Sequence, residues 1–292
     1  MCVFLLALAA TPARAGSADQ GVVFVAEQAA DKDDFGLVVD IDQSLIAVGS
    51  RQSDPRFDDR GIVYIFENTP AGITRLASLV PQDNPAWFGS DIALSGQVLL
   101  AGAPGAQFRE GAAYLFERQD DAWVEVATLR RKADVRKEKG FFGSAVGLDG
   151  DLAVIGAPGV DAFGEDAGIA MIYKRHDGSW TPTATLKPDQ AGERFGTSVA
   201  IEGNRVLIGA PGDEHESVGH AYLFERTAKG WQRIARLSAA AGTGGNAFGY
   251  AVALNNDRAL VGARYADSIE PKTGAAYVFE PLDDGWAQVA KL

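Results

Sequence analysis

The stretch FGSAVGLDGDLAVIGAP (residues 142–158) decides the fold, because the chain repeats it closely at 195–211 as FGTSVAIEGNRVLIGAP. Each copy contains a Phe-Gly pair, an apolar run, a glycine-containing turn pair and a second apolar run that ends in Gly-Ala-Pro. Two such runs with two turn residues between them are typical of a β-hairpin. The stretch therefore predicts a repeated β unit.

The repeat occurs five times, with Phe-Gly pairs at steps of 53, 54, 53 and 53 residues, beginning at Phe35, Phe88, Phe142, Phe195 and Phe248. A second glycine follows fourteen residues after each of these: Gly49, Gly102, Gly156, Gly209 and Gly262. A third glycine opens runs such as GAAYLF: Gly61, Gly111, Gly168, Gly219 and Gly274. Twelve residues later comes the start of a fourth run, such as WVEVATL, at Ile73, Trp123, Trp180, Trp231 and Trp286.

Four strand-like runs in each unit of about 53 residues are typical of a β-propeller. The second run, as in RVLIGA, is apolar on both faces, which fits a strand between two neighbouring blades. The fourth run alternates between apolar and polar residues, which fits an outer strand with one solvent-exposed face. We predict an all-β propeller of four-stranded antiparallel blades, with five repeats present and almost no helix.

The composition narrows the class of partner. The chain has 292 residues, 47% of them hydrophobic, and a formal net charge of -12. That content is enough for a sizeable core. A strongly acidic surface repels nucleic acid and anionic lipid, so we expect neither as a partner and no membrane insertion.

The N-terminal residues MCVFLLALAATPARA resemble a signal peptide, with an apolar run and an A-x-A cleavage site. We expect residues 1–15 to be removed on export, and with them Cys2, which is the only cysteine. A mature chain without disulfides favours a bacterial protein that is secreted, periplasmic or on the cell surface. Residues 16–34 are then an N-terminal segment with one strand at 21–28.

The order FG, GAP, G-x-x-Y-x-F and W resembles the FG-GAP repeat family, which includes the propeller of integrin α subunits and exported bacterial proteins. The resemblance covers residues 35–292, as repeats at 35–87, 88–141, 142–194, 195–247 and 248–292. It implies a binding or adhesion module for an extracellular protein or glycan. Because 21–28 adds a strand to five four-run repeats, we expect a six- or seven-bladed ring, with a closed five-bladed ring as the alternative.

Calcium binding is not carried over from the family. Integrin-type repeats place a calcium loop between the first two strands, whereas this chain has short turns such as LDGDL there. These lack the six to eight oxygen ligands that Ca²⁺ takes. We read Asp149 and Asp151 as turn residues and expect no cofactor and no metal, although calcium elsewhere remains open.

The lengths of the connections point to one face. The step from Phe-Gly to GAP is 14 in every copy, and the step from the third glycine to the Trp position is 12. The other two connections vary between copies. In an antiparallel meander these two lie at the same end, so we expect partners to bind there. Neutral drift of the freer loops is the alternative.

Charged residues are concentrated in the same variable connections. The acidic candidates for this binding face are Asp54, Asp58, Asp59, Asp161, Glu165, Asp166, Asp213, Glu214, Glu216, Asp267 and Glu270. One connection is basic and supplies the candidates Arg130, Arg131 and Lys132. These residues could meet a charged partner, or they could simply keep the loops solvated.

No catalytic motif stands out. His215 and His220 in HESVGH are five residues apart, whereas the zinc-binding HExxH motif needs a spacing of four on a helix. No G-x-S-x-G elbow occurs, and no catalytic residue is assigned. We expect no enzyme activity. The alternative is that the repeats form the non-catalytic propeller domain of a larger secreted enzyme.

Overall fold

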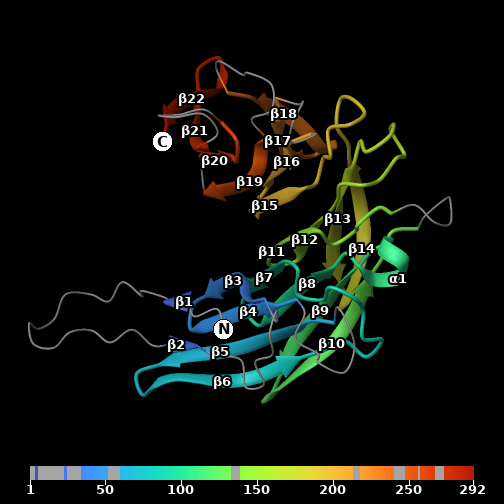
Figure 1. Ribbon diagram of the computed structural model, residues 1–292, viewed down its shortest axis with the longest axis vertical. Coiled ribbons are helices and arrows are strands. Elements are labelled where there is room, and N and C mark those ends of the chain that lie inside the picture. Colours follow the sequence, from blue (N-terminus) through green and yellow to red (C-terminus); the bar gives the residue numbers. More distant parts are fainter. Residues whose placement is uncertain are drawn as a thin grey trace, which may run out of the picture.

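A computed structural model describes residues 4–5, 23–24, 34–51, 60–132, 139–212, 218–239, 247–255, 257–266 and 273–292. Within these residues the chain forms five four-stranded antiparallel sheets, which are the blades of a β-propeller fold (Figure 1). A two-residue pairing of β1 (Phe4–Leu5) with β2 (Val23–Phe24) lies outside the blades.

Each blade is a meander in chain order, so neighbours in sequence are neighbours in the sheet. Blade 1 consists of β3 (Phe35–Asp42), β4 (Leu45–Ser50), β5 (Ile62–Thr69) and β6 (Gly72–Leu79). Blade 2 consists of β7 (Ile92–Ser95), β8 (Val98–Ala103), β9 (Ala112–Gln119) and β10 (Ala122–Leu129). Blade 3 consists of β11 (Ala145–Asp149), β12 (Leu152–Ala157), β13 (Ile169–His176) and β14 (Ser179–Leu186). Blade 4 consists of β15 (Ser198–Glu202), β16 (Arg205–Ala210), β17 (His220–Thr227) and β18 (Gly230–Leu237). Blade 5 consists of β19 (Phe248–Asn255), β20 (Arg258–Ala263), β21 (Ala275–Leu282) and β22 (Gly285–Lys291).

The hydrophobic core lies between the blades. One buried cluster joins Leu45 and Ile65 of blade 1 to Phe88 and Leu99 of blade 2, and three similar clusters join the later pairs. The second strand of each inner blade is buried on both faces, as its continuous apolar run predicts. Each blade therefore depends on its neighbours for burial.

The repeated glycines make the close contacts at these joints. A Cβ atom on Gly102 would lie under 3.0 Å from the carbonyl oxygen of Gly143, the Phe-Gly glycine of the next blade. The same conflict occurs at Gly49, Gly156 and Gly209. The third glycine of blades 1 to 4 is pressed in the same way against the carbonyl of the next Phe. The motif residues recognised in the sequence are thus the points where consecutive backbones meet.

Carboxylates also connect consecutive blades. Asp40 accepts a hydrogen bond from the backbone N–H of Leu94 at 2.6 Å. At the hairpin tips, Asp149 accepts from the N–H of Gly203 in the next blade at 2.5 Å. Asp42 and Ser95 occupy the same repeat position and accept from the equivalent turn glycines, Gly96 and Gly150. Asp149 therefore has a structural role as a turn residue.

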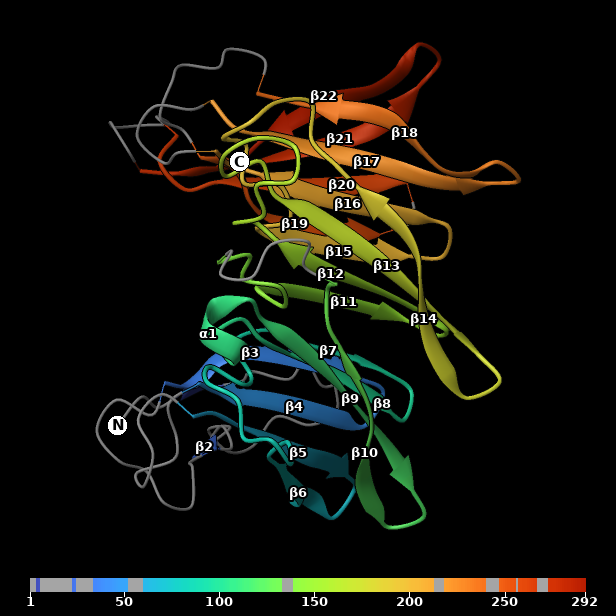
Figure 2. The same cartoon turned by 90° about the vertical axis from the view of Figure 1, so that its right-hand side faces the viewer.

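The blades follow one another along a curved row, with their first strands toward the centre and their fourth strands outside, and a gap separates blade 1 from blade 5 (Figures 1 and 2). Among the described residues no closed five-bladed ring is formed. The short element α1 (Ala106–Arg109) follows β8; it is a single turn whose backbone is left-handed at Gln107 and Phe108, and the described ranges contain no other helix. Those ranges contain no helix that is long and apolar enough to cross a membrane.

Candidate binding face

The described parts of the connections of variable length lie on one side of the row of blades (Figure 2). We call this side the loop face. It consists of the crossovers between blades and the turns between second and third strands, whose described parts are 80–91, 104–111, 130–132, 139–144, 158–168, 187–197, 211–212, 218–219, 238–239, 247, 264–266 and 273–274. The uniform hairpins between first and second strands and between third and fourth strands lie at the opposite side (Figure 2).

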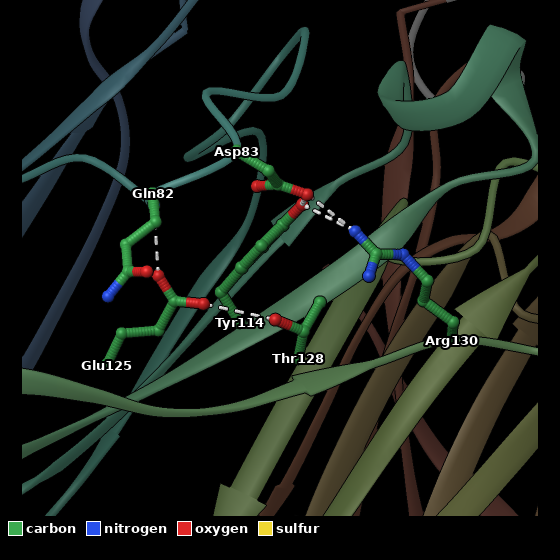
Figure 3. A network of polar contacts seen from close by, with 6 residues as sticks. All are labelled: Gln82, Asp83, Tyr114, Glu125, Thr128 and Arg130. Atoms are coloured by element: carbon green, nitrogen blue, oxygen red, sulfur yellow. Dashed lines mark hydrogen bonds and ion pairs between the residues drawn. The ribbon is translucent and has the colours of Figure 1, made fainter.

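The crossover into blade 2 is fixed by a polar network (Figure 3). The Asp83 carboxylate accepts hydrogen bonds from the Tyr114 hydroxyl at 3.0 Å and from Arg130 at 2.6 Å. The Arg130 guanidinium also lies 5.9 Å from the centroid of the Tyr114 ring. Burial and the nearby Asp83 carboxylate raise the pKa of Tyr114 above its ordinary value. The phenol therefore stays protonated and keeps donating to Asp83.

Glu125 supports the same crossover from β10. Its carboxylate accepts from the backbone N–H of Gln82 at 3.1 Å and from the Thr128 hydroxyl at 3.0 Å (Figure 3). Two adjacent crossover residues are thus held by the third and fourth strands of blade 2. This part of the loop face is therefore held by side chains of blade 2.

Blade 4 contains an equivalent polar network made of other residues. The hydroxyl of Tyr222, at the position of Tyr114, donates to Glu193 at 2.7 Å. Arg236 lies 3.8 Å from Asp189 and 4.0 Å from Glu193, and Arg233 forms a short ion pair with Asp189. Burial is the main cause that raises the pKa of Glu193. In both blades a Tyr of the third strand, an acid of the incoming crossover and an Arg form a network that we call the Tyr lock; Arg130 follows β10 directly, whereas Arg236 lies in β18.

His220 lies beside this second lock. Its Nε2 is 2.6 Å from a guanidinium nitrogen of Arg236. Burial and the Arg236 charge lower the pKa of His220 to about 4. The imidazole is therefore neutral near pH 7 and can accept the hydrogen bond from Arg236. His215, its predicted companion, lies outside the described residues.

The acidic turn of blade 3 is folded on itself. Asp161 accepts a hydrogen bond from the N–H of Asp166 at 2.8 Å, and the carbonyl of Glu165 accepts from Gly192 at 2.8 Å. Asp166 lies 3.8 Å from Arg194 of the next crossover. The three carboxylates stand on one turn, and two of them already have partners: Asp161 within the turn and Asp166 in the next crossover.

The turn of blade 2 presents an aromatic side chain to solvent. Gln107, Phe108 and Arg109 have φ values of 49°, 59° and 75°, a left-handed conformation that costs non-glycine residues energy. This conformation leaves Phe108 98% exposed, while Arg109 stacks 5.1 Å from the Trp87 ring. An exposed Phe held on a strained turn is a feature typical of binding loops.

The structure places only some of the predicted binding-face residues. Arg130 belongs to the lock of blade 2, so its charge is already paired, while Lys132 is exposed beside it and Arg131 is partly buried. Asp161, Glu165 and Asp166 share one turn. The remaining acidic candidates lie outside the described residues: Asp54, Asp58, Asp59, Asp213, Glu214, Glu216, Asp267 and Glu270.

Sequence reasoning missed Phe108 and the two Tyr locks. The tyrosines of G-x-x-Y-x-F could have been found, because they recur at a fixed position. Nothing in AQFR indicates a left-handed turn. In the part of the chain that the structure describes, no three His, Cys, Asp or Glu side chains are grouped closely enough to hold a metal ion. The absence of a cofactor stays a prediction.

Comparison with known proteins supports the fold. The family model described as FG-GAP repeat matches residues 19–66, 123–173, 180–224 and 231–279, about two thirds of the chain. The chain belongs to the FG-GAP repeat family. Each of the last three matched segments of this FG-GAP protein begins in or beside the fourth strand of one blade and ends in the third strand of the next. The matched segments leave out 67–122, which contains α1.

The FG-GAP protein is also similar to an integrin chain. Over 233 residues it is 26% identical to integrin alpha-M of Mus musculus, which is 74% of the chain and 19% of the relative. It therefore spans about a fifth of the length of that relative. Family membership and this likeness support a binding module, and they favour a non-catalytic domain.

Proposed function

We propose that this FG-GAP protein is an exported, non-catalytic module that binds an extracellular protein through its loop face. The observation that carries this proposal is the asymmetry of the two sides of the row. The hairpin side is uniform in all five blades, whereas the loop side varies in length and presents Phe108 and the charged turns. Loops can vary there without disturbing the joints.

The chemistry of the loop face supports a protein partner with an apolar pocket. Phe108 would fill such a pocket, and Arg109, fixed against Trp87, would meet an acidic or carbonyl group at its rim. The Lys187 ammonium lies 4.9 Å from the half-exposed Phe163 ring on the neighbouring blade and offers a second contact of the same kind. Exposed aromatic and cationic groups of this type dominate many protein interfaces.

The proposal is tested by selecting a phage-displayed protein library on the immobilised protein. Selected binders should lose affinity for the Phe108→Ala variant by tenfold or more, about 1.4 kcal/mol. Lys229→Ala, at an exposed hairpin tip of the opposite side, is the control and should leave affinity unchanged. Binders that lose affinity only for hairpin-side variants would contradict the assignment of the face. Glycan arrays, probed in parallel, test the alternative partner class.

A further inference from the structure

The turn that carries Phe108 is held on two sides by neighbouring crossovers. On one side, a Cβ atom on Gly105 would lie 2.8 Å from a ring carbon of Trp87, so the start of the turn packs against the crossover into blade 2. On the other side, the carbonyl oxygen of Arg109 accepts a hydrogen bond at 3.0 Å from the N–H of Phe141, at the entry to blade 3. These contacts define the position of Phe108 in the unbound chain, which lowers the entropy cost of inserting its ring into a partner.

Cationic side chains lie beside this turn. A Cβ atom on Gly140 would lie 3.5 Å from the Arg131 guanidinium and 3.7 Å from the carbonyl oxygen of Glu110, at the end of the turn. Lys132, which follows Arg131, and Lys139, which precedes Gly140, are both exposed. The two described ends of the basic connection between blades 2 and 3 therefore lie next to the turn.

The turn between the second and third strands of blade 3 continues this surface. A Cβ atom on Gly140 would lie 3.0 Å from the side chain of Val160, so this turn begins against the same connection. Phe163, three residues further along, is half-exposed, and the Lys187 ammonium lies 4.9 Å from the centre of its ring. We call the two exposed rings and the cations around them the cationic patch, which consists of Phe108, Phe163, Arg109, Arg131, Lys132, Lys139 and Lys187.

The cationic patch has the opposite sign to the chain as a whole. The chain carries a formal net charge of -12, whereas the patch contains five cationic side chains. The described acids within two residues of the patch are Glu110, Asp161, Glu165 and Asp189, and Asp189 is paired with Arg233 of blade 4. The cations outnumber these acids. At physiological ionic strength exposed charges act over about 8 Å, so a partner in contact with the patch is attracted mainly by its cations.

We propose that the cationic patch binds an acidic protein surface, on which carboxylates surround an apolar pocket that receives Phe108. This partner chemistry rests on the proposed function of the loop face. The projecting ring gains most when it is fully removed from water, which a protein pocket achieves and a glycan chain does not. An anionic membrane is an extended plane and would also meet the acidic turns of the loop face, whereas a protein surface can match the patch alone.

The test uses the binders selected from the phage-displayed protein library on the immobilised full chain. The double variant Lys132→Glu, Lys139→Glu reverses two cations of the patch. The matched control is Lys174→Glu, Lys229→Glu, which changes the net charge equally at two exposed lysines outside the patch. Binders that need Phe108 should lose about tenfold or more in affinity for the patch variant, mainly through slower association, and keep their affinity for the control. Circular dichroism checks that both variants fold.

The outcomes separate the chemistry of the partner from the choice of face. If Phe108→Ala weakens the binders but the two charge variants behave alike, the acidic partner is wrong and the loop face stands. If no binder depends on Phe108, both proposals fail. Replacing the contacting carboxylates of a binder by lysine should restore its affinity for the patch variant, and no recovery would contradict the pairing of charges. Heparin and phosphatidylglycerol vesicles probe the other classes: binding of either that needs the lysines but not Phe108 would overturn the proposal.

Discussion

The Asp91 carboxylate of blade 2 accepts a hydrogen bond from the backbone N–H of Val146 in blade 3, with 2.7 Å between oxygen and nitrogen. The same side chain accepts from its own neighbour, Ile92, at 3.1 Å. Burial in the joint raises the pKa of Asp91 to about 7, and the hydrogen bonds only partly oppose this. The joint therefore contains an acid that changes charge near neutral pH.

Asp91 should make folding stability depend on pH. Its pKa is higher in the folded than in the unfolded protein, so the folded state holds the proton more tightly between pH 4 and 7. Its contribution is present below about pH 4 and is lost as the pH rises through about 7. Urea unfolding at a series of pH values should show that the stability of Asp91→Asn falls less than that of wild type between pH 4 and 7, by up to about 4 kcal/mol.

Other buried acids also contribute to the pH dependence of wild-type stability. Burial also raises the pKa of Asp40 and Glu193, so the wild-type curve has more than one source. The difference between wild type and Asp91→Asn isolates the one group. Parallel curves for the two proteins would show that Asp91 does not titrate in this window.

Substitution of the GAP glycine should destabilise the protein far more at Gly102, which lies in a joint, than at Gly262 of blade 5. Gly102→Ala places a methyl group against the Gly143 carbonyl and should lower the free energy of unfolding by about 3 kcal/mol or more. Gly262→Ala is the matched control, since its Cβ has room. Chemical denaturation of both at low protein concentration measures the difference. Equal losses would contradict the account of the joint.

The Tyr locks should differ in strength. Tyr114→Phe removes the donor to a partly exposed Asp83 and should cost about 1 kcal/mol. Tyr222→Phe leaves the buried Glu193 without its shortest hydrogen bond and should cost more, up to about 3 kcal/mol. Thermal or urea unfolding compares them. A larger loss for Tyr114→Phe would reverse the assigned order.

Substitutions of Asp149 and Asp151 at the hairpin tip of blade 3 distinguish a structural role of these acids from a metal-binding role. Asp149→Ala removes the acceptor for Gly203 and should cost about 1 kcal/mol. Asp151, on the other side of the same turn, is exposed, and Asp151→Ala should change stability little. Both values should be the same in EDTA and in calcium. A calcium-dependent rise in wild-type stability that Asp149→Ala abolishes would show a metal site there.

The repeat arithmetic of the sequence predicted the blade architecture because its markers are contact points. Gly49, Gly102 and their equivalents are fixed by the approach of the next backbone, which no larger residue permits. The loop face was predicted on length alone, and its locks arise from side chains distant in sequence, such as Asp83 with Arg130. Such pairings follow from the three-dimensional path of the crossover and leave no local pattern.

The backbone before each Phe-Gly pair could not be predicted. Trp87 and Phe141 have φ values of 62° and 52°, in a region that bulky residues rarely adopt. The residues at this position share no chemical type: Asp34, Trp87, Phe141, Arg194 and Ala247. Tertiary contacts impose the conformation, so local preference gives no signal.

The matched segments 123–173, 180–224 and 231–279 are out of step with the blades, each extending from the fourth strand of one into the third strand of the next. A segment copied in that frame carries one Phe-Gly pair and one pair of receiving glycines, such as Phe142-Gly143 with Gly156 and Gly168, so successive copies can form the same joint with each other. Tandem duplication of the corresponding DNA would then lengthen the row without requiring two unrelated surfaces to adapt to each other. Blade number can change in a single genetic event, whereas the fit at each joint is inherited ready-made.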